Sequence, residues 1–141
     1  MLNFRQLQIK IYVMKKLKIH NTAKTPLINF DYDIGLIEIK GRSLIENTAM
    51  FYERPLAWIN EYVKDPKDIT TVNIALDYYN TSSQLWLFQI FHILSDLFAL
   101  KKNIILNWYY QDEDMCEAGA DFSKLLDIPV NLVESKDAFK L

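Results

Sequence analysis

Hydroxyl side chains gather in the run Asn80-Thr81-Ser82-Ser83, between a stretch that alternates like a strand and one with helical periodicity. Asn, Thr and Ser side chains accept hydrogen bonds from the free N–H groups of a first helical turn. The run is therefore typical of a helix N-cap at Asn80 or Thr81. A hydroxyl in this place can also carry a phosphate, which would meet the same N–H groups and the positive helix end. The spacing alone leaves both interpretations open: a cap with no further role, or a phosphorylation site.

A second group with possible chemistry is acidic. It consists of Asp112, Glu113, Asp114, Glu117 and Asp121. Carboxylates at this density could hold a hard divalent cation, but the group lacks the glycine and the ligand spacing of a calcium loop. Acidic residues in a first helical turn also complement the helix dipole, which is the simpler interpretation. A small-ligand-binding or divalent-metal-binding domain that uses this group is the alternative function.

Other chemistry-bearing residues do not form a recognisable set. His20 and His92 lie on different predicted elements without paired cysteines, which argues against a zinc site. Cys116 has no evident partner base, so a nucleophilic role is not indicated. Three glycines in the whole chain cannot build a dinucleotide fingerprint. The sequence predicts no enzyme class and no cofactor.

The bulk properties set limits on the class of protein. The 141 residues suit one domain, and half of them are apolar. The net charge of −2 argues against nucleic-acid binding, and no run reaches the ~20 apolar residues of a membrane span. A single cysteine excludes an internal disulfide and suits a reducing compartment, so we expect a cytoplasmic protein. We expect the domain to cover residues 14–141. We expect residues 1–13 to be an extension, disordered or due to a mis-assigned start.

Hydrophobic periodicity gives the order of elements. It predicts strands at 17–20, 27–31, 36–40, 69–76, 104–110 and 130–133, and helices at 46–64, 82–100 and 112–126. Pro55 should kink the first helix or begin its second half. The order predicts an α/β fold: a single domain with a mixed sheet and about three helices packed against it. Strands 69–76 and 104–110 should be parallel neighbours joined by helix 82–100, and strand 69–76 should be buried on both faces.

Helix 82–100 has more apolar residues than one buried face needs. Leu85 and Phe88 remain near its start, on the side that carries Thr81. Apolar residues left over beside a helix N-terminus indicate a surface for a partner. The alternative is that the third helix or a loop covers them.

Several short motifs, in this order and spacing, resemble the SiaC family of bacterial regulatory phosphoproteins. They are Gly41-Arg42-Ser43, Glu46-Asn47, Phe51-Tyr52, Pro55-Leu56, Trp58, Tyr79 to Ser83, Trp108-Tyr109-Tyr110, Asp114-Met115 to Gly119, and Ile128-Pro129-Val130. The resemblance runs from about residue 17 to residue 134, nearly the whole predicted domain. The family is similar to anti-sigma-factor antagonists, which implies a STAS-like fold.

The resemblance also implies a function. By position, Thr81 is the residue that a partner-switching kinase phosphorylates and a phosphatase resets. In its unphosphorylated form such a protein binds a diguanylate cyclase, which links it to cyclic-di-GMP signalling and biofilm formation. We therefore expect a phospho-switchable regulator that is not an enzyme and has neither nucleic-acid nor membrane partners. The expected contacts with protein partners surround Thr81, at Tyr79, Asn80, Ser82, Ser83, Leu85 and Phe88.

Overall fold

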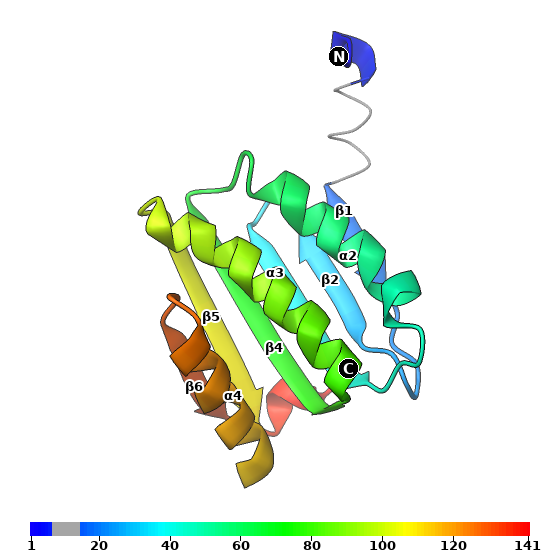
Figure 1. Ribbon diagram of the computed structural model, residues 1–141, viewed down its shortest axis with the longest axis vertical. Coiled ribbons are helices and arrows are strands. Elements are labelled where there is room, and N and C mark those ends of the chain that lie inside the picture. The colour runs from blue at the N-terminus through cyan, green and yellow to red at the C-terminus, as the bar shows by residue number, and fades with distance from the viewer. Residues whose placement is uncertain (7–14) are drawn as a thin grey trace.

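One six-stranded sheet and the helices α2, α3 and α4 make up the fold of the computed structural model, which describes residues 1–6 and 15–141 (Figure 1). The elements are β1 (Lys16–Ile19), β2 (Leu27–Asp31), β3 (Leu36–Ser43), α2 (Thr48–Tyr62), β4 (Ile69–Tyr79), α3 (Thr81–Ala99), β5 (Asn103–Tyr110), α4 (Glu113–Leu125), β6 (Val130–Glu134) and the short 3-10 helix η1 (Asp137–Phe139). The predicted order of strands and helices is confirmed. Among the described residues, no helix combines the length and the apolar character that crossing a membrane requires.

The strands lie side by side in the order in which they occur along the chain. The first three form antiparallel pairs, β1 with β2 and β2 with β3. From β3 onward each pair is parallel, and β4 and β5 are neighbours joined by α3, as predicted. Helix α2 runs through Pro55 as one element, so the proline does not begin a second helix. The predicted boundary between residues 13 and 14 lies outside the described residues.

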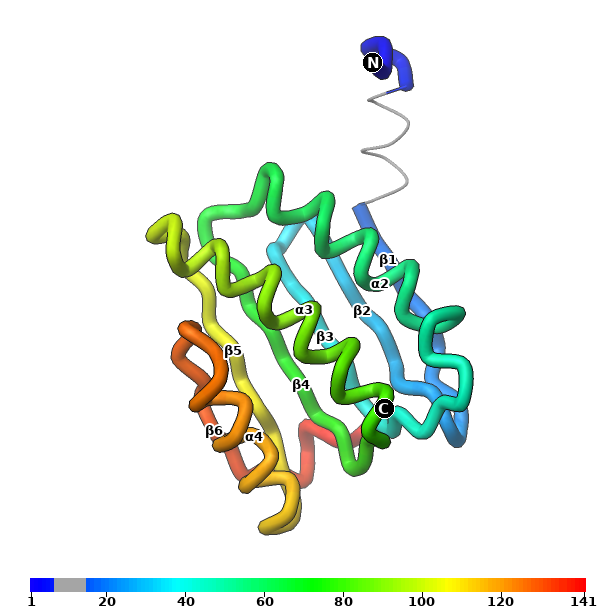
Figure 2. The backbone as a smooth tube through the Cα atoms, viewed as in Figure 1, coloured from blue at the N-terminus to red at the C-terminus, as the bar shows by residue number. Residues whose placement is uncertain are grey.

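The three helices cover the same face of the sheet (Figures 1 and 2). The core lies between them and the sheet. Its largest fully buried side chains include Trp108, Tyr52, Phe30 and Phe91. This arrangement corrects the prediction that strand 69–76 is buried on both faces. Ile69 is 54% exposed, and burial alternates along the first half of β4 because only one face there is covered by helices. At the other end of the strand η1 packs against β4 from behind the sheet.

The open face of the sheet carries a continuous row of polar side chains. Asn29, Glu38, Asn73, Asn107 and Asn131 are paired in register from β2 to β6. The Nδ2 groups of Asn29 and Asn73 each donate to one carboxylate oxygen of Glu38 at 3.0 Å. The amide of Asn107 donates to Asn73 at 3.0 Å, and that of Asn131 donates to Asn107 at 3.1 Å. The row joins the antiparallel and parallel halves of the sheet through a single carboxylate.

Glu38 should make stability depend on acid pH. Burial alone would raise the pKa of this carboxyl. The hydrogen bonds from Asn73 and Asn29 and the nearby Lys40 outweigh it, so the pKa is lowered. A lowered folded-state pKa gives stability that is present above the unfolded value of about 4.3 and lost as pH falls through the folded value. In Glu38→Gln the new amide N–H₂ would face the N–H₂ of Asn29 or Asn73, which leaves two donors without an acceptor. We therefore expect the free energy of unfolding to fall by about 1–3 kcal/mol at neutral pH.

Urea unfolding of both proteins at a series of pH values checks this expectation. The difference in unfolding free energy between the wild type and Glu38→Gln should shrink as the pH is lowered below 5, where the wild-type carboxylate becomes protonated. A difference that stays constant from neutral to acid pH would show that the Glu38 charge does not organise the row.

Candidate functional site

Asn80, rather than Thr81, caps helix α3. Its backbone is extended, with φ −85° and ψ 172°, and its Oδ1 accepts a hydrogen bond from the backbone N–H of Ser83 at 2.9 Å. The hydroxyl of Ser82 donates to the same Oδ1 at 3.2 Å. The cap left open between Asn80 and Thr81 is therefore Asn80, and Thr81 is the first residue of the helix.

The cap residue also ties α3 to the segment that leads into α2. The backbone N–H of Asn80 donates to the carbonyl oxygen of Ser43 at 3.0 Å. Its side-chain Nδ2 donates to the carbonyl oxygen of Ile45 at 2.9 Å. The Asn80 carbonyl oxygen in turn accepts from Gln84 N–H at 3.0 Å. All four hydrogen-bonding groups of Asn80 are therefore used: its backbone N–H and carbonyl oxygen, and its side-chain N–H₂ and oxygen. The start of α3 is held in one position by this residue.

A fully buried hydroxyl network lies beneath the cap. The Ser43 hydroxyl donates to the Ser83 hydroxyl at 2.7 Å, and the Ser83 hydroxyl donates to the Ser43 carbonyl oxygen at 3.1 Å. The Tyr52 hydroxyl lies 2.6 Å from Ser43 Oγ and is left as the donor there. Burial raises the pKa of Tyr52 to about 12, so its hydroxyl keeps its proton at neutral pH. The network joins α2, β3 and α3 under the candidate site.

Thr81 is the accessible hydroxyl of the run. Its side chain is exposed, and within the described part of the chain its hydroxyl makes no hydrogen bond. Ser82 is half-buried and bound to Asn80, whereas Ser83 is fully buried in the hydroxyl network. The structure thus separates three neighbouring hydroxyls into one that an enzyme can reach and two with structural bonds. Ser83, although predicted as a partner contact, has no exposed surface to offer.

An apolar ridge extends from Thr81 along the outer side of α3. Leu85, one turn on, is 63% exposed, so neither α4 nor a loop covers it. Phe88 is half-buried and stacks on His92, with 6.0 Å between ring centroids. Tyr79, by contrast, is half-buried and packs edge-on against Trp108 at 6.2 Å. Of the predicted contact residues, Leu85 and Phe88 therefore share a surface with Thr81, and Tyr79 mainly supports the core beneath it.

Sequence reasoning missed Leu44, which follows β3 and is 39% exposed. It lies beside the cap, because both of its chain neighbours accept hydrogen bonds from Asn80 through their carbonyl oxygens. No local pattern marks this residue, since its position depends on the pairing of β3 with β4. Leu44 adds a second apolar side chain next to the start of α3.

The charges at this end of the domain are the helix termini and a few side chains. The N-termini of α2, α3 and α4 all lie at the edge of the sheet where the parallel strands end (Figure 1). Asp112 caps α4 by accepting from Met115 N–H at 2.9 Å, and Glu113 and Asp114 occupy its first turn. The described residues contain no group of three or more His, Cys, Asp or Glu side chains that could hold a metal ion. Asp112, Glu113 and Asp114 complement the positive end of α4, and the metal-binding alternative gains no support from the geometry of the acidic group.

Comparison with known proteins identifies the family to which the chain belongs. The family model for "SiaC family regulatory phosphoprotein" matches residues 19–135, more than four fifths of the chain. The chain belongs to the SiaC family. An uncharacterised protein of Pseudomonas aeruginosa strain UCBPP-PA14 is 25% identical over 118 residues, which cover 82% of this chain and 94% of that protein. The resemblance inferred from the motifs is therefore confirmed, and with it the assignment to a family of regulatory proteins.

Solved structures of SiaC from P. aeruginosa share the fold. Apo-SiaC superposes with a TM-score of 0.79 at 24% identity and covers 84% of this chain and 98% of its own. SiaC in the crystal structure of "diguanylate cyclase SiaD in complex with its activator SiaC" gives a TM-score of 0.80 at 24% identity, with 84% and 99% covered. The predicted mixed α/β domain is that of the SiaC structures; the STAS-type likeness stays an expectation.

Proposed function

We propose that this protein is a cytoplasmic, phosphorylation-controlled regulator whose unmodified form binds and activates a diguanylate cyclase. The observation that carries the proposal is the exposed Thr81 hydroxyl at the start of α3, directly beside the exposed Leu85. Membership of a regulatory phosphoprotein family supports the phosphate, and the solved complex of a relative with a diguanylate cyclase supports the class of partner. The free thiol of Cys116 suits a reducing compartment.

The proposed cycle needs two further partners, a protein kinase and a phosphatase. A phosphate on Thr81 adds about −1.5 to −2 charges at neutral pH. The positive end of α3 attracts this charge by roughly 0.3–1 kcal/mol, so phosphorylation leaves the domain folded. Phosphorylation instead weakens binding. A partner that packs on Leu85 would remove water from the phosphate dianion next to it, which costs free energy. Unless the partner supplies Arg or Lys, the phosphorylated form is released. In this scheme the protein carries the phosphate and catalyses no reaction itself.

Incubation with the cognate kinase and ATP, followed by mass spectrometry, tests the site. We expect one phosphate, on Thr81, and none on Ser82 or Ser83. Thr81→Ala should remain unmodified and should cost little stability, well below the ~1 kcal/mol of a lost cap, because Asn80 is the cap. Ser82→Ala is the matched control and should be phosphorylated like the wild type. A phosphate found elsewhere, or equal affinity of the two forms for the cyclase, would contradict the proposal.

A further inference from the structure

Strand β6 lies at one edge of the sheet and, within the described chain, pairs only with β5 (Figure 1). The chain after β6 turns behind the sheet, where η1 packs on β4, so it does not run along this edge (Figure 2). The backbone N–H of Ser135 donates to the Tyr110 carbonyl oxygen at 3.0 Å. Because successive residues of a strand point their N–H and C=O groups to opposite sides, the odd-numbered residues of β6 bond to β5. Val130, Leu132 and Glu134 therefore direct these groups outward, where no described residue pairs with them.

The polar row of the open face also ends at this edge. Every amide in the row donates toward Glu38, so Asn131 gives one N–H to Asn107 and is the last member. The Oδ1 atom of Asn131 and its second amide N–H have no partner among the described residues. A side chain that both donates and accepts at this level of a further strand would extend the row. An amide that faces Asn131 does so through two reciprocal hydrogen bonds.

A second copy of β6 matches this edge residue by residue when a two-fold axis passes between the two Asn131 residues. The strands are then antiparallel, and the Asn131 amides face each other on the open face. On the helix face Val130 opposes Leu132 of the other copy, and Leu132 is 39% exposed in the single chain. Because both residues direct their backbone groups outward, each such pair exchanges two backbone hydrogen bonds. An axis shifted to Leu132 would instead set the Asn131 amide against the apolar Val133.

The edge strand at the other end of the strand order, β1, does not match a second copy of itself. Its side chains on the open face are Lys16 and Lys18, and both are exposed. A two-fold pairing of β1 with itself would set lysine against lysine, and like charges directly opposite each other destabilise a strand pair. Charged side chains of this kind protect edge strands against the addition of another strand. In β6, by contrast, every residue before Glu134 is uncharged.

Helix α4 leaves room for a second copy beside it. It packs on both β5 and β6, so its axis runs above the boundary between them. With strands ~4.8 Å apart, the α4 axes of two copies joined at β6 lie roughly 10 Å apart, the spacing of packed helices. On α4, Phe122 packs on Tyr79, toward the centre of the sheet. The side of α4 turned toward the β6 edge carries the small, half-buried Cys116, Ala120 and Ser123, which let a second helix approach.

We propose that β6 is a two-fold interface at which two copies of this chain join their sheets edge to edge. The polar rows of the two copies meet in the pair of Asn131 amides, and Val130 and Leu132 form the apolar contact under the two α4 helices. A two-fold contact uses the same edge on both copies, so it closes as a dimer. Thr81 lies on α3, on the other side of α4 from this edge, and stays accessible (Figure 1). The inference is independent of whether Thr81 is phosphorylated.

Cysteine cross-linking tests the register of the two strands. Cys116→Ser first removes the only native thiol, and Asn131→Cys is added to that variant. Opposed residues of an antiparallel pair that exchange no hydrogen bonds have Cα atoms ~4.5 Å apart, which a disulfide can span. Mild oxidation should therefore give a covalent dimer that a reductant reverses. Leu132→Cys faces Val130 of the other copy and should stay uncross-linked. A covalent dimer from Leu132→Cys, or none from Asn131→Cys, would overturn the proposal.

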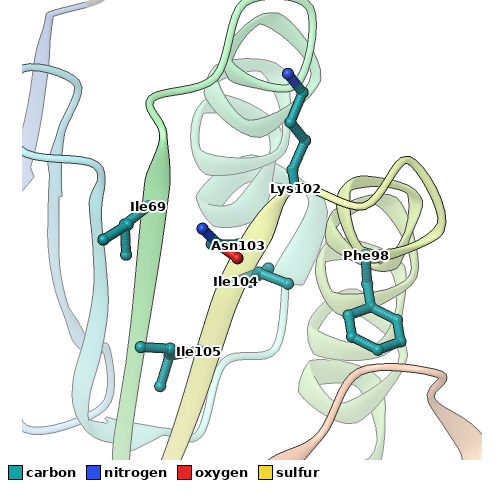
Figure 3. A pocket seen from close by; sticks show the side chains of 6 residues that line it. All are labelled: Ile69, Phe98, Lys102, Asn103, Ile104 and Ile105. Atoms are coloured by element: carbon teal, nitrogen blue, oxygen red, sulfur yellow. The ribbon is translucent and has the colours of Figure 1, made fainter.

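Sedimentation velocity over a wide range of protein concentration tests association without a cross-link. The wild type should shift from monomer to dimer as the concentration rises. Asn131→Asp sets two carboxylates against each other at the two-fold axis and should weaken the dimer at least ~10-fold at neutral pH. Asn103→Asp is the matched control, because Asn103 is exposed at the hollow where β5 begins (Figure 3), and it should associate like the wild type. Thermal unfolding shows whether each variant is folded. A wild type that stays monomeric at every concentration, or equal weakening in the two variants, would refute the dimer.

Discussion

Leu85→Asp should abolish tight binding of the unmodified protein to the proposed cyclase partner while leaving the domain folded. An unpaired carboxylate that loses its water in an apolar contact costs several kcal/mol, so we expect affinity to fall at least ~30-fold. Leu85 is 63% exposed and lies one helical turn after Thr81, so its loss and the Thr81 phosphate act on the same surface. The new carboxylate mimics the charge of the phosphate without modification of Thr81. Calorimetric titration of the cyclase with each variant measures the change.

Gln89→Asp provides the matched control for this prediction. Gln89 is exposed one turn further along α3 and receives the same charge. It should bind within a few-fold of the wild type, because it loses no apolar contact. Circular dichroism should show the same helix content in all three proteins. If Leu85→Asp binds as tightly as the wild type, the ridge on α3 is not the cyclase surface, whatever the role of Thr81.

Gly119→Ala should destabilise the domain strongly, although it adds only one methyl group. A Cβ on Gly119 would overlap Trp108 Cδ1 and come within 2.7 Å of Leu132 Cδ2. The Leu132 side chain can rotate, but the Trp108 ring cannot retreat. It is fully buried, and its Nε1–H donates to the Met115 carbonyl oxygen at 2.8 Å. Helix α4 must therefore move away from β5, and we expect a loss of about 3 kcal/mol.

The sign of this effect is what makes it informative. At an exposed helix position, replacement of glycine by alanine stabilises by about 1 kcal/mol through backbone entropy. Urea unfolding followed by tryptophan fluorescence measures the difference. Glu117→Ala, on an exposed position of the same helix, should change stability by less than ~0.5 kcal/mol. A Gly119→Ala protein as stable as the wild type would show that α4 does not pack closely over Trp108.

Local features of the sequence were sufficient for the elements and their order. The strand predicted at 27–31 coincides with β2, because side-chain alternation is set by the backbone of a single strand. The start of α3 follows from the Asn-Thr-Ser-Ser run, since capping bonds span only three residues. The parallel pairing of β4 and β5 was predictable from the preference for helical crossover connections between neighbouring parallel strands. The motifs that resembled the SiaC family rest on such local runs as well.

The faces of the sheet were harder to predict. The apolar run at the end of β4 suggested a strand covered on both sides, but Thr71 and Asn73 face the open side, half-buried. Which side of a sheet the helices cover depends on the direction of every crossover, and no window of sequence contains that information. The same holds for the polar row on the open face, where Asn73 and Glu38 are 35 residues apart and meet only because β3 and β4 are in one register.

The sequence alone determined that a helix begins close to the Asn80-Thr81 pair and that three hydroxyls follow one another there. Only the tertiary structure decided which of them is available. Ser83 turns inward because Ser43 and Tyr52, on β3 and α2, offer it buried hydrogen-bond partners. Thr81, two residues earlier, is rotated to the outer side of the helix and has no such partner within the described residues. The physical reason is that a cap depends on neighbours in the chain, whereas burial depends on contacts between segments up to 40 residues apart.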